Sequence, residues 1–304
     1  MYNKTPLRYP GGKAKIAPFV RSLFEMNGFC DGQYIEPYAG GAGVAVDLLI
    51  SEYAREIHLN DASYPVYCFW HALLHTPEYL CRRLSDVRVT PATWTRQRNI
   101  MRDSKGRAPH EIGFAFLFLN RTNRSGIISG GMIGGKEQTG AWLIDARFYR
   151  EEMIRRIRLI SDYAHRISIY CMDAECFIAD VVNNLTGKCC VYFDPPYYVA
   201  GQRLYLNTYQ PEDHARIANL IQYKTRHPWF LTYDDHPAIR KLYADRRRIS
   251  FELRYSASSS HAGTESMFFS DDLKIPKGIL KPIAIDPSGA RTRRSGVRKI
   301  SIVA

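Results

Sequence analysis

Strand-like runs alternate with helix-length segments along most of this chain, and this alternation constrains the fold more than any other feature. The runs are rich in β-branched and aromatic residues and lie at 33–38, 55–61, 166–171, 188–194, 228–234, 247–255 and 265–269. The helix-length segments include 13–26, 41–52, 175–185 and 210–226. Alternation of this kind predicts βα units, which build a largely parallel sheet with helices on its faces.

The last two expected strands break this pattern. They are joined by the short polar sequence SASSSHAGT, which cannot hold a crossover helix. Parallel strands need such a crossover, whereas antiparallel strands can be joined by a short loop. We therefore expect an α/β fold with a seven-stranded mixed sheet that ends in an antiparallel hairpin.

The segment 75–165, between the second and third expected strands, predicts a second lobe. It is mainly helical in pattern and carries Arg-rich and Gly-rich pieces, but it has no good strand of the buried kind. The main domain would then combine 1–74 with 166–273. The remaining tail, 274–304, lacks apolar periodicity and is basic, with Arg291, Arg293, Arg294, Arg298 and Lys299. A flexible arm that touches phosphates and an inert solvated terminus are both open interpretations of this tail.

The charge balance points to a polyanionic partner. The chain has 42 lysine and arginine residues against 30 aspartate and glutamate residues, which gives a formal net charge of +12. Nucleic acid is the leading candidate, and a basic surface without a specific partner is the alternative. The 20 tyrosines favour nucleic acid, because aromatic rings among basic residues suit stacking on bases.

Cysteine usage and hydropathy predict the class of protein. The seven cysteines include no Cys-x-x-Cys pair, so we expect reduced thiols and no zinc site. The N-terminal sequence MYNKTPLRYPGGKAK has no apolar signal core, and no stretch approaches the roughly 18 apolar residues of a membrane span. We expect a soluble, cytoplasmic protein.

The sharpest motif is Asp194-Pro195-Pro196-Tyr197, directly after the apolar run 190–193. This position is the carboxyl end of a parallel strand, where open α/β sheets bind their ligands. The two prolines fix φ and supply no N–H, so the turn is stiff and its carbonyls are available as acceptors. The Asp194 carboxylate and the Pro195 carbonyl can together accept both hydrogens of one amino group. An ordinary strand-ending turn is the alternative interpretation.

Such a pair of acceptors suits the amino group of adenine, whose nitrogen is a poor nucleophile because its lone pair is delocalised into the ring. Two aimed acceptors would direct that lone pair toward an incoming methyl group. They would also stabilise the positive charge that develops on the nitrogen. The ring of Tyr197 would offer the base a surface for stacking.

A glycine-rich turn closes the first expected strand, in the sequence EPYAGGAG at 36–43. Its glycines allow a tight turn and close approach of the backbone to a ligand. The turn lacks both the full G-x-G-x-x-G pattern and a Gly-Lys-Ser/Thr sequence, so it does not indicate a nucleoside triphosphate. Asp61 ends the next strand and could bind the hydroxyls of a ribose. A purely structural turn is the alternative.

A third motif, Arg8-Tyr9-Pro10-Gly11-Gly12-Lys13, precedes the first helix, where Tyr9 and Lys13 could lie over a cofactor. Together the three motifs resemble the D12 class, or Dam-like, DNA adenine-N6 methyltransferases. That family has a P-G-G-K motif, a glycine-rich motif, an Asp-ending strand, a target-recognition insert and D-P-P-Y in this order. Further matches are the sequence FLFLNR at 116–121, Tyr233 in a late strand, and the closing segment from Tyr255 to Glu265. The resemblance covers about residues 5–270.

The resemblance implies a Rossmann-like S-adenosylmethionine-dependent methyltransferase fold, with 75–165 as the target-recognition insert. It implies the following cofactor-binding residues: Tyr9, Gly11, Gly12, Lys13, Glu36, Pro37, Ala39, Gly40, Gly41, Gly43, Asp61 and Asp173. The catalytic clamp on a flipped adenine would be Asp194, Pro195, Pro196 and Tyr197. The cofactor would be S-adenosylmethionine, and no metal is implied.

Within the insert, the resemblance implies DNA-binding roles for Asn120, Arg121, Asn123, Arg124 and Ser129. Family members that read GATC follow the Asn-Arg pair with the sequence YGYNGLCR, where this chain has TNRSGIIS. The final arginine of that sequence, which would read a guanine edge, becomes Ser129 here. We therefore do not expect recognition of GATC.

The expected partner is double-stranded DNA, with a cognate restriction enzyme as a further candidate and a monomer or weak dimer as the expected state. Association with the nucleoid follows from DNA binding. A non-catalytic DNA-binding protein, and a methyltransferase of cytosine N4 or of RNA, are the alternatives. Cytosine-N4 enzymes usually have serine where Asp194 stands.

Two other polar groups have ordinary structural explanations. His261 with the serines at 258–260 resembles a nucleophile and base, but no elbow motif accompanies it, and a solvated loop is the favoured interpretation. The sequence Asp234-Asp235-His236 could suggest a metal, but Asp235 before His236-Pro237 is a good helix start signal.

Overall fold

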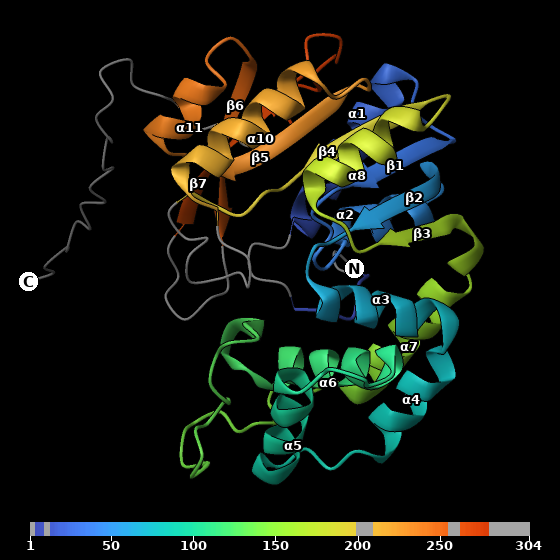
Figure 1. Cartoon of the computed structure of the whole chain (residues 1–304), viewed down its shortest axis with the longest axis vertical. Coiled ribbons are helices and arrows are strands. Elements are labelled where there is room, and N and C mark those ends of the chain that lie inside the picture. Colours follow the sequence, from blue (N-terminus) through green and yellow to red (C-terminus); the bar gives the residue numbers. More distant parts are fainter. Residues whose placement is uncertain (1–3, 9–12, 199–208, 255–261, 280–304) are drawn as a thin grey trace, which may run out of the picture.

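The computed structural model describes residues 4–8, 13–198, 209–254 and 262–279, without the side chains of 252–254, 262 and 263. A seven-stranded sheet in the order β3-β2-β1-β4-β5-β7-β6 forms its centre (Figure 1). The strands are β1 (Gly32–Glu36), β2 (Ala54–Asn60), β3 (Ile167–Tyr170), β4 (Cys189–Phe193), β5 (Trp229–Asp234), β6 (Arg247–Arg254) and β7 (Ala262–Phe269). Strands β1 to β5 pair in parallel, whereas β7 is antiparallel to both β5 and β6. The predicted mixed sheet with a terminal antiparallel hairpin is confirmed.

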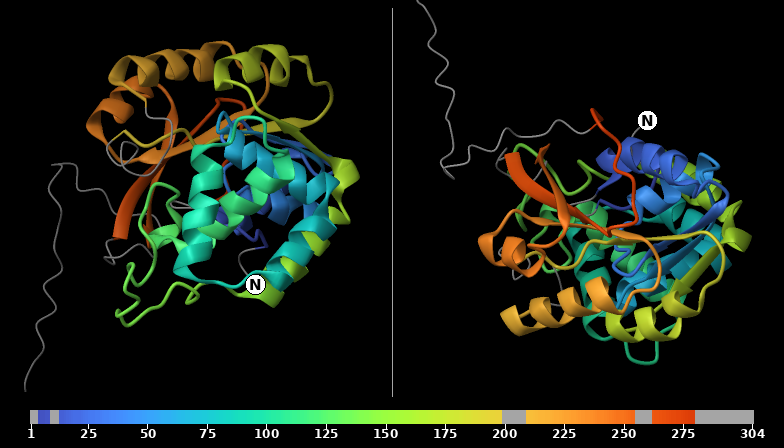
Figure 2. Two further views of the ribbon diagram at one scale, coloured as in Figure 1. Left: turned by 60° about the horizontal axis from the view of Figure 1, so that its bottom comes forward. Right: turned by 90° about the horizontal axis from the view of Figure 1, so that it is seen from above.

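Each face of the sheet has its own apolar core, because alternate residues of a strand point to opposite faces. Tyr34 and Tyr192 belong to one core, with α1 (Ala17–Asn27), α2 (Gly43–Ile50) and α3 (Tyr64–His75). Ile35 and Val191 belong to the other core, with α8 (Ala174–Asp180), α10 (Pro211–Tyr223) and α11 (Pro237–Leu242). Figure 2 shows α8 and α10 across the sheet from α1. The described crossover helices lie on the two faces of the sheet, so the carboxyl ends of β1 to β5 lie together at one edge.

The insert is mainly helical, as predicted. It contains α4 (Pro77–Asp86), α5 (Pro91–Arg102), α6 (Pro109–Thr122) and α7 (Arg150–Ser161). Helices α4, α5 and α6 begin with proline, whose fixed φ suits the first helical position. Along the whole of the described chain, four short helical turns join these elements: η1 (Ala14–Ile16), η2 (Arg124–Gly126), η3 (Ala164–Arg166) and η4 (Val182–Asn184).

Helix α6 packs against α3 at very short range. A Cβ atom added at Gly113 would lie 2.5 Å from the backbone oxygen of Cys68, so only glycine allows this approach. The buried side chains of α3, of α6 and of one face of the sheet form a continuous core. The insert therefore packs on the main domain through α3. The part of the insert that does not contact α3 lies beside the carboxyl edge of the sheet (Figure 1).

The segment after β5 starts a helix as expected, one residue later than the sequence indicates. The cap of α11 is His236, whose Nδ1 accepts a hydrogen bond from the backbone N–H of Ala238. Asp235 instead accepts a hydrogen bond from Ser266 and forms an ion pair with Arg240. These contacts join α11 to β7, and they give Asp235 a structural role.

Candidate active site

Acidic residues follow the carboxyl ends of all five parallel strands. Glu36 ends β1, Asp61 follows β2, Asp173 follows β3, Asp194 follows β4 and Asp234 ends β5. Carboxyl ends of parallel strands meet at one edge of a sheet, which is the usual ligand site of an open α/β fold. A ligand that carries positive charge and hydroxyl groups would fit this row of acceptors.

Asp194 is held in a fixed orientation by two donors. The Lys13 ammonium lies 2.9 Å from Oδ1 and 3.1 Å from Oδ2, and the Thr232 hydroxyl donates to Oδ1 at 2.8 Å. Two hydrogen bonds therefore occupy Oδ1, whereas Oδ2 keeps capacity for a further donor. Burial raises the pKa of Asp194 above its ordinary value, and Lys13 and Thr232 oppose this rise.

The orientation of Thr232 depends on its neighbour in the sheet. The hydroxyl of Tyr192 lies 2.7 Å from the hydroxyl of Thr232, and both are buried. Since Thr232 donates its single hydrogen to Asp194, Tyr192 is the donor in this second contact. A directed chain from Tyr192 through Thr232 thus ends on the carboxylate of Asp194.

Tyr197, predicted as a stacking surface, is mostly buried and takes part in a hydrogen-bond network. Its hydroxyl accepts from Lys13 at 2.6 Å and donates to Oε1 of Glu265 at 2.5 Å. The Lys13 ammonium also lies 4.9 Å from the centroid of the Tyr197 ring. Glu265, on β7, ends a segment that matches the family, but the sequence interpretation assigned it no role in the site.

The glycine-rich turn has the tight geometry that its sequence predicts. Gly40 has φ of 45°, and Ala42, which caps α2, also has φ of 45°. Oε1 of Glu36 accepts a hydrogen bond from the N–H of Ala45 at 3.2 Å, so this carboxylate lies against the first turn of α2. Burial is the main cause that raises the pKa of Glu36 to about 8, and the nearby Asp194 contributes to this rise. The turn and the D-P-P-Y motif therefore lie close together.

The other residues predicted in this turn support its shape. The backbone oxygen of Pro37 accepts a hydrogen bond from the side-chain amide of Asn60 at 3.0 Å. The N–H of Ala39 donates to the backbone oxygen of Asn60 at 2.8 Å. Gly41 is buried within the turn. A Cβ atom at Gly43 would lie 3.1 Å from the Cβ of Ala14, so glycine allows the turn to pack against η1.

Asp61 connects the end of β2 to this turn. Its Oδ2 accepts from the N–H of Gly40 and its Oδ1 from the N–H of Ser63, both at 2.9 Å. Burial raises its pKa to about 6, although these backbone hydrogen bonds lower it. Asp173, which is exposed, caps α8 by accepting from the N–H of Glu175 at 2.8 Å. Each carboxylate retains acceptor capacity for ligand hydroxyl or amino groups.

A family model described as D12 class N6 adenine-specific DNA methyltransferase matches residues 9–257 of the chain. The chain belongs to this family. It is accordingly an S-adenosylmethionine-dependent enzyme that methylates N6 of adenine in DNA, and its sheet is the Rossmann-like methyltransferase sheet. Comparison with curated proteins gives no match.

The solved structures that are distantly similar to this D12 methyltransferase include the following two proteins. A conserved hypothetical protein from Streptococcus pyogenes has a TM-score of 0.32 and 11% identity, over 80% of this chain and 88% of that chain. A putative RNA methyltransferase from Pyrococcus horikoshii has a TM-score of 0.40 and 9% identity, over 87% of this chain and 88% of that chain.

The row of carboxylates in this D12 methyltransferase fits its cofactor chemically. S-adenosylmethionine carries a sulfonium, an ammonium and a ribose diol, which all favour carboxylate neighbours. The predicted residues Glu36 and Asp61 lie at the expected edge, and Asp173 lies at the end of the next strand. Lys13, by contrast, contacts the D-P-P-Y motif. The predicted cofactor residues Tyr9, Gly11 and Gly12 lie outside the described residues.

Three of the predicted DNA-binding side chains are buried in the D12 methyltransferase insert. The Asn120 amide bonds the backbone N–H and oxygen of Arg8, both at 2.8 Å. The Asn123 amide accepts from the Trp94 indole at 2.6 Å and donates to two backbone oxygens. Arg121 is also buried, with 5% of its surface exposed. Asn120 and Asn123 therefore shape the loop after α6, because their polar groups are already paired with protein groups.

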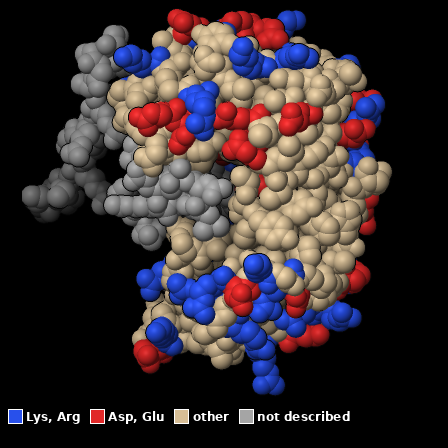
Figure 3. Space-filling view, viewed as in Figure 1, with Lys and Arg blue, Asp and Glu red and all other residues tan. Residues whose placement is uncertain are grey.

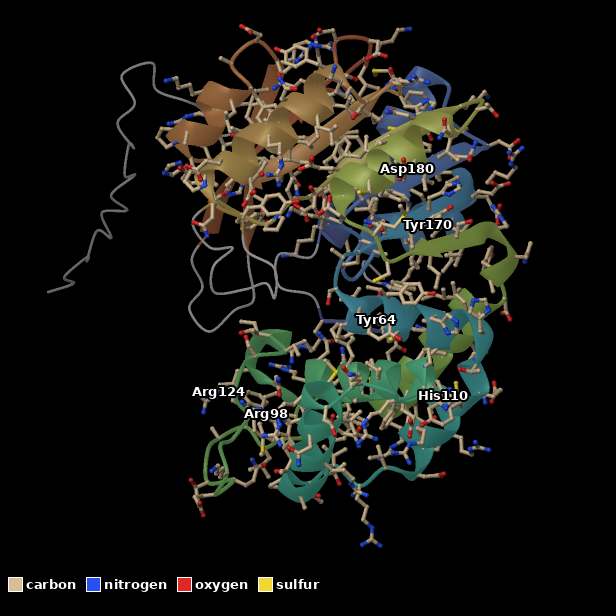
Figure 4. All side chains as sticks on the ribbon, in the orientation of Figure 1. Tyr64, Arg98, His110, Arg124, Tyr170 and Asp180 are labelled. Carbon is tan, nitrogen blue, oxygen red and sulfur yellow. The ribbon has the colours of Figure 1, made fainter. Side chains whose placement is uncertain are left out.

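The remaining two predicted DNA-binding residues face outward. Arg124 and Ser129 are both exposed. Arg98 lies over the ring of Trp94, which bonds Asn123, so α5 adjoins the loop that carries Arg124. Figure 4 shows Arg98 and Arg124 on the same side of the insert, away from His110.

Four arginines lie together between the N-terminal segment and the insert. Of these four, the sequence interpretation named only Arg121 as a DNA-binding residue. Burial is the main cause that lowers the pKa of Arg121 to about 10, and the charges of Arg8, Arg156 and Arg147 contribute to this decrease. Within the described residues, Nη1 of Arg8 and Nε of Arg121 are buried without a hydrogen-bond partner. We call Arg8, Arg121, Arg147 and Arg156 the arginine cluster. Its members come from separate segments, so no local sequence signal could reveal it.

An exposed aromatic side chain adjoins this cluster. Trp142 is 63% exposed, and its ring lies 5.2 Å from the guanidinium carbon of Arg147. Arg147 also donates to the hydroxyl of Tyr149 at 3.3 Å, and Tyr149 is 53% exposed. Figure 3 shows lysine and arginine side chains gathered over this part of the molecule.

The sequence also raised the questions of a metal site, a membrane-spanning helix and a serine–histidine site. Within the described ranges, no group of three or more His, Cys, Asp or Glu side chains could hold a metal ion. None of the described helices combines the length and the apolar character that crossing a membrane requires. His261 and the serines at 258–260 lie outside the described residues.

Proposed function

We propose that this methyltransferase acts on an adenine turned out of duplex DNA, and that Asp194 and the Pro195 carbonyl hold its amino group. One observation carries the proposal most of all. Lys13 and Thr232 together fix the carboxylate of Asp194 at the carboxyl edge, and they leave acceptor capacity on Oδ2. An acceptor fixed before the substrate arrives does not reorganise during the reaction.

The proposed chemistry depends on the hydrogens of the target amine. The cofactor supplies an electrophilic methyl group when it is bound. Oδ2 of Asp194 accepts one amine hydrogen and the Pro195 oxygen accepts the other, which directs the nitrogen lone pair toward the methyl group. The new bond to nitrogen would form as the methyl–sulfur bond of the cofactor breaks and leaves a neutral thioether. The two acceptors stabilise the positive charge on the nitrogen until one of its two hydrogens leaves as a proton. A base must leave the helical stack to reach them, and extrusion costs a few kcal/mol.

Tyr197 contributes its ring to the base pocket in this proposal, with the hydroxyl fixed between Lys13 and Glu265. Pro196 keeps the turn stiff. Glu36, Asp61 and Asp173, beside the glycine-rich turn, would hold the cofactor. Glu36 would bind its methionine end, and Asp61 would bind the hydroxyls of its ribose.

The insert, residues 75–165, contacts the DNA in this proposal. Arg147, which is half-buried at the outer side of the arginine cluster, offers N–H donors to phosphate oxygens, because guanidinium groups bind phosphate through two parallel hydrogen bonds. Arg124 and Ser129 contact the duplex from the exposed loop, and Trp142 stacks on a base. The basic tail, 274–304, is a further candidate for phosphate contacts.

The distribution of large exposed apolar side chains among the described residues supports a monomer or weak dimer. Met26 on α1, Tyr64 on α3, Tyr223 on α10 and Ile279 lie on separate segments, whereas Trp142, Leu143 and Tyr149 lie close together on the insert. A large contiguous apolar patch would favour a stable interface. Light scattering at several protein concentrations tests this state. Nucleoid association through duplex binding, and a cognate restriction enzyme that cleaves unmodified sites, complete the proposal.

Native DNA sequencing tests the substrate and the site together. We would express the wild type and Asp194→Ala in cells that lack adenine methylation, with Asp180→Ala on α8 as the matched control (Figure 4). N6-methyladenine at a defined sequence is expected with the wild type and the control only. Methyl groups found instead on RNA or on cytosine N4 would contradict the proposal.

Base extrusion needs its own measurement. A duplex with 2-aminopurine at the target position is expected to gain fluorescence when the wild-type protein binds, because the base loses its stacked neighbours. The same probe one position away serves as the control. Equal and unchanged fluorescence at both positions would refute extrusion.

A further inference from the structure

Glu265 is a buried carboxylate beside the proposed catalytic turn, and the chemistry described above does not use it. It lies on β7, opposite Asp234 of β5, with 1% of its surface exposed. Because β7 is antiparallel to β5, this early part of β7 lies at the carboxyl edge of the parallel strands. Glu265 is therefore close to the row of site carboxylates, although it belongs to a different part of the sequence.

The hydrogen bonds of Glu265 set the direction of the Tyr197 hydroxyl. Tyr197 donates its single hydrogen to Oε1 of Glu265 at 2.5 Å. Its oxygen lone pairs are then left for the Lys13 ammonium, which donates to this oxygen at 2.6 Å. Without an acceptor at Glu265, the hydroxyl hydrogen could turn toward Lys13 and oppose that contact.

The position of the Lys13 ammonium in turn depends on Tyr197, Asp194 and Glu265 itself. This ammonium lies between the hydroxyl of Tyr197 and the carboxylate of Asp194, and it is 3.5 Å from Oε1 of Glu265. Burial alone lowers the pKa of Lys13, but Asp194 and Glu265 more than offset burial, so the pKa stands above its ordinary value. The ammonium thus stays charged and is held on the side of Asp194 that faces Tyr197.

Glu265 also has an unusual feature of its own. Among the residues that the structure describes, its Oε2 is buried and has no hydrogen-bond partner. An unpaired buried oxygen costs about 1–3 kcal/mol, more if the group is charged. Burial raises the pKa of Glu265 to about 7, and Asp194 adds to the rise while Lys13 opposes it. A residue that needed only to fill space would carry no such cost, which indicates a role beyond packing.

We propose that Glu265 is a positioning residue for methyl transfer: acting through the Tyr197 hydroxyl, it holds Lys13 against Asp194 and so fixes where Oδ2 of Asp194 points. The inference rests on the proposed role of Asp194. It assigns Glu265 no contact with substrate. Its effect therefore belongs in the rate of the chemical step, and binding of DNA and cofactor should change little.

Two substitutions at Glu265 distinguish its role as a hydrogen-bond acceptor from the effect of its charge. Glu265→Leu removes the acceptor for Tyr197, and we expect kcat to fall on the order of 10- to 100-fold, because a small misplacement of a reacting group has effects of this size. Glu265→Gln keeps an acceptor oxygen, so it should recover most of the loss. The KM values for DNA and cofactor should stay within about twofold, since the contacts with both ligands remain. Glu212→Gln, at the exposed start of α10, is the control.

Tyr197→Phe tests the route of the effect. It keeps the ring and removes only the hydroxyl, so it should reproduce the kcat loss of Glu265→Leu. In the double variant the two losses should not multiply, because both substitutions break the same link. Circular dichroism checks the fold of each variant. If Glu265→Leu fails to fold, Tyr197→Phe alone decides.

The outcomes distinguish this inference from the proposed function. Wild-type kcat in folded Glu265→Leu or in Tyr197→Phe would overturn the role of Glu265, and so would losses that multiply in the double variant. If Asp194→Ala is inactive in either of these cases, the proposed function still stands. If Asp194→Ala retains full activity, the proposed function fails first, whatever the Glu265 variants do.

Discussion

The ammonium of Lys13 lies 2.9 Å from Oδ1 of Asp194, and this contact joins residues that are 181 positions apart. Both side chains are largely buried, with 3% and 18% of the side-chain surface exposed. The N-terminal P-G-G-K motif therefore contributes directly to the acceptor site of the D-P-P-Y motif. Lys13 orients the carboxylate, a role that its sequence position beside a glycine turn does not reveal.

Asp194→Ala is expected to remove the amine acceptor while cofactor binding persists. The rate of methyl transfer should fall on the order of 10²-fold or more, as in other sites that lose one oriented hydrogen-bonding group. Single-turnover transfer of labelled methyl groups to duplex DNA measures the rate, and calorimetry measures cofactor affinity. Asp180→Ala should match the wild type in both. Near-normal turnover in Asp194→Ala would remove this residue from the mechanism.

Glu36→Gln is expected to stabilise the fold at high pH. The folded state holds the Glu36 proton up to pH of about 8, whereas the unfolded chain releases it near the ordinary value of 4.5. The folded state binds more protons between these values, so this group makes stability fall as pH rises across that range. Glutamine keeps an acceptor for Ala45 and removes the ionisation.

The stability difference in this experiment should grow with pH. Chemical denaturation of both proteins at pH 5 and pH 8.5 measures it. We expect the advantage of Glu36→Gln to be larger at pH 8.5 by about 1 kcal/mol or more, since one pKa unit corresponds to about 1.4 kcal/mol. Glu151→Gln, at an exposed position of α7, should show no such trend. An advantage that shrinks as pH rises would contradict the burial effect at Glu36.

Arg147→Ala is expected to weaken DNA binding equally for all sequences. A phosphate contact releases counterions, so losing one should reduce the slope of log affinity against log salt by about 0.9. Titrations at several salt concentrations, with a labelled duplex, measure the slope. Arg55→Ala lies near the start of β2, at the opposite edge of the sheet, and should leave the slope unchanged. The same slope in Arg147→Ala and the wild type would exclude this phosphate contact.

Trp142→Ala is expected to weaken DNA binding by about 1–3 kcal/mol, the usual size of one base-stacking contact. Tyr223→Ala is a matched control, because Tyr223 is also largely exposed and lies 5.6 Å from the guanidinium carbon of Arg246. It lies on α10, away from the insert. Fluorescence anisotropy measures both affinities. Equal losses in the two variants would indicate a general surface effect.

Asn123→Ala is expected to lower the free energy of unfolding by about 1–3 kcal/mol. Its amide is fully buried and pairs with the Trp94 indole and the oxygens of Ile127 and Ile128, which would lose their partner. Denaturant unfolding measures the change, with the exposed Asn99→Ala on α5 as the control. A loss of DNA binding without any loss of stability would instead favour direct contact by Asn123.

Much of the fold could be predicted because its signals are local. The runs that became β1 to β7 are rich in β-branched and aromatic residues, and the short polar sequence between the last two runs excludes a crossover helix. The glycine-rich turn and the prolines at 195 and 196 restrict the backbone through their own covalent geometry. Strand patterns and turn geometry depend on residues that are close in sequence, so the sequence alone is enough to predict them.

The roles of the insert residues could be predicted less well. Asn120, Arg121 and Asn123 are polar in a basic segment, which favours a solvent-exposed interpretation. The structure instead pairs the two amides with backbone groups and an indole, which offsets the cost of their burial. Polarity alone cannot tell whether a side chain meets water or a backbone group, because both satisfy the same donors and acceptors.

The amino-acid sequence by itself determined the strand pattern, the stiff acceptor turn and the family of this protein. Only the tertiary structure decided that Lys13 orients Asp194, that Glu265 holds Tyr197, and that arginines from separate segments face one another. The physical reason is the length of chain that each contact spans. Sheet pairing and helix packing bring these groups together, and a side chain's pKa or hydrogen-bond partner exists only once its distant neighbours are in place.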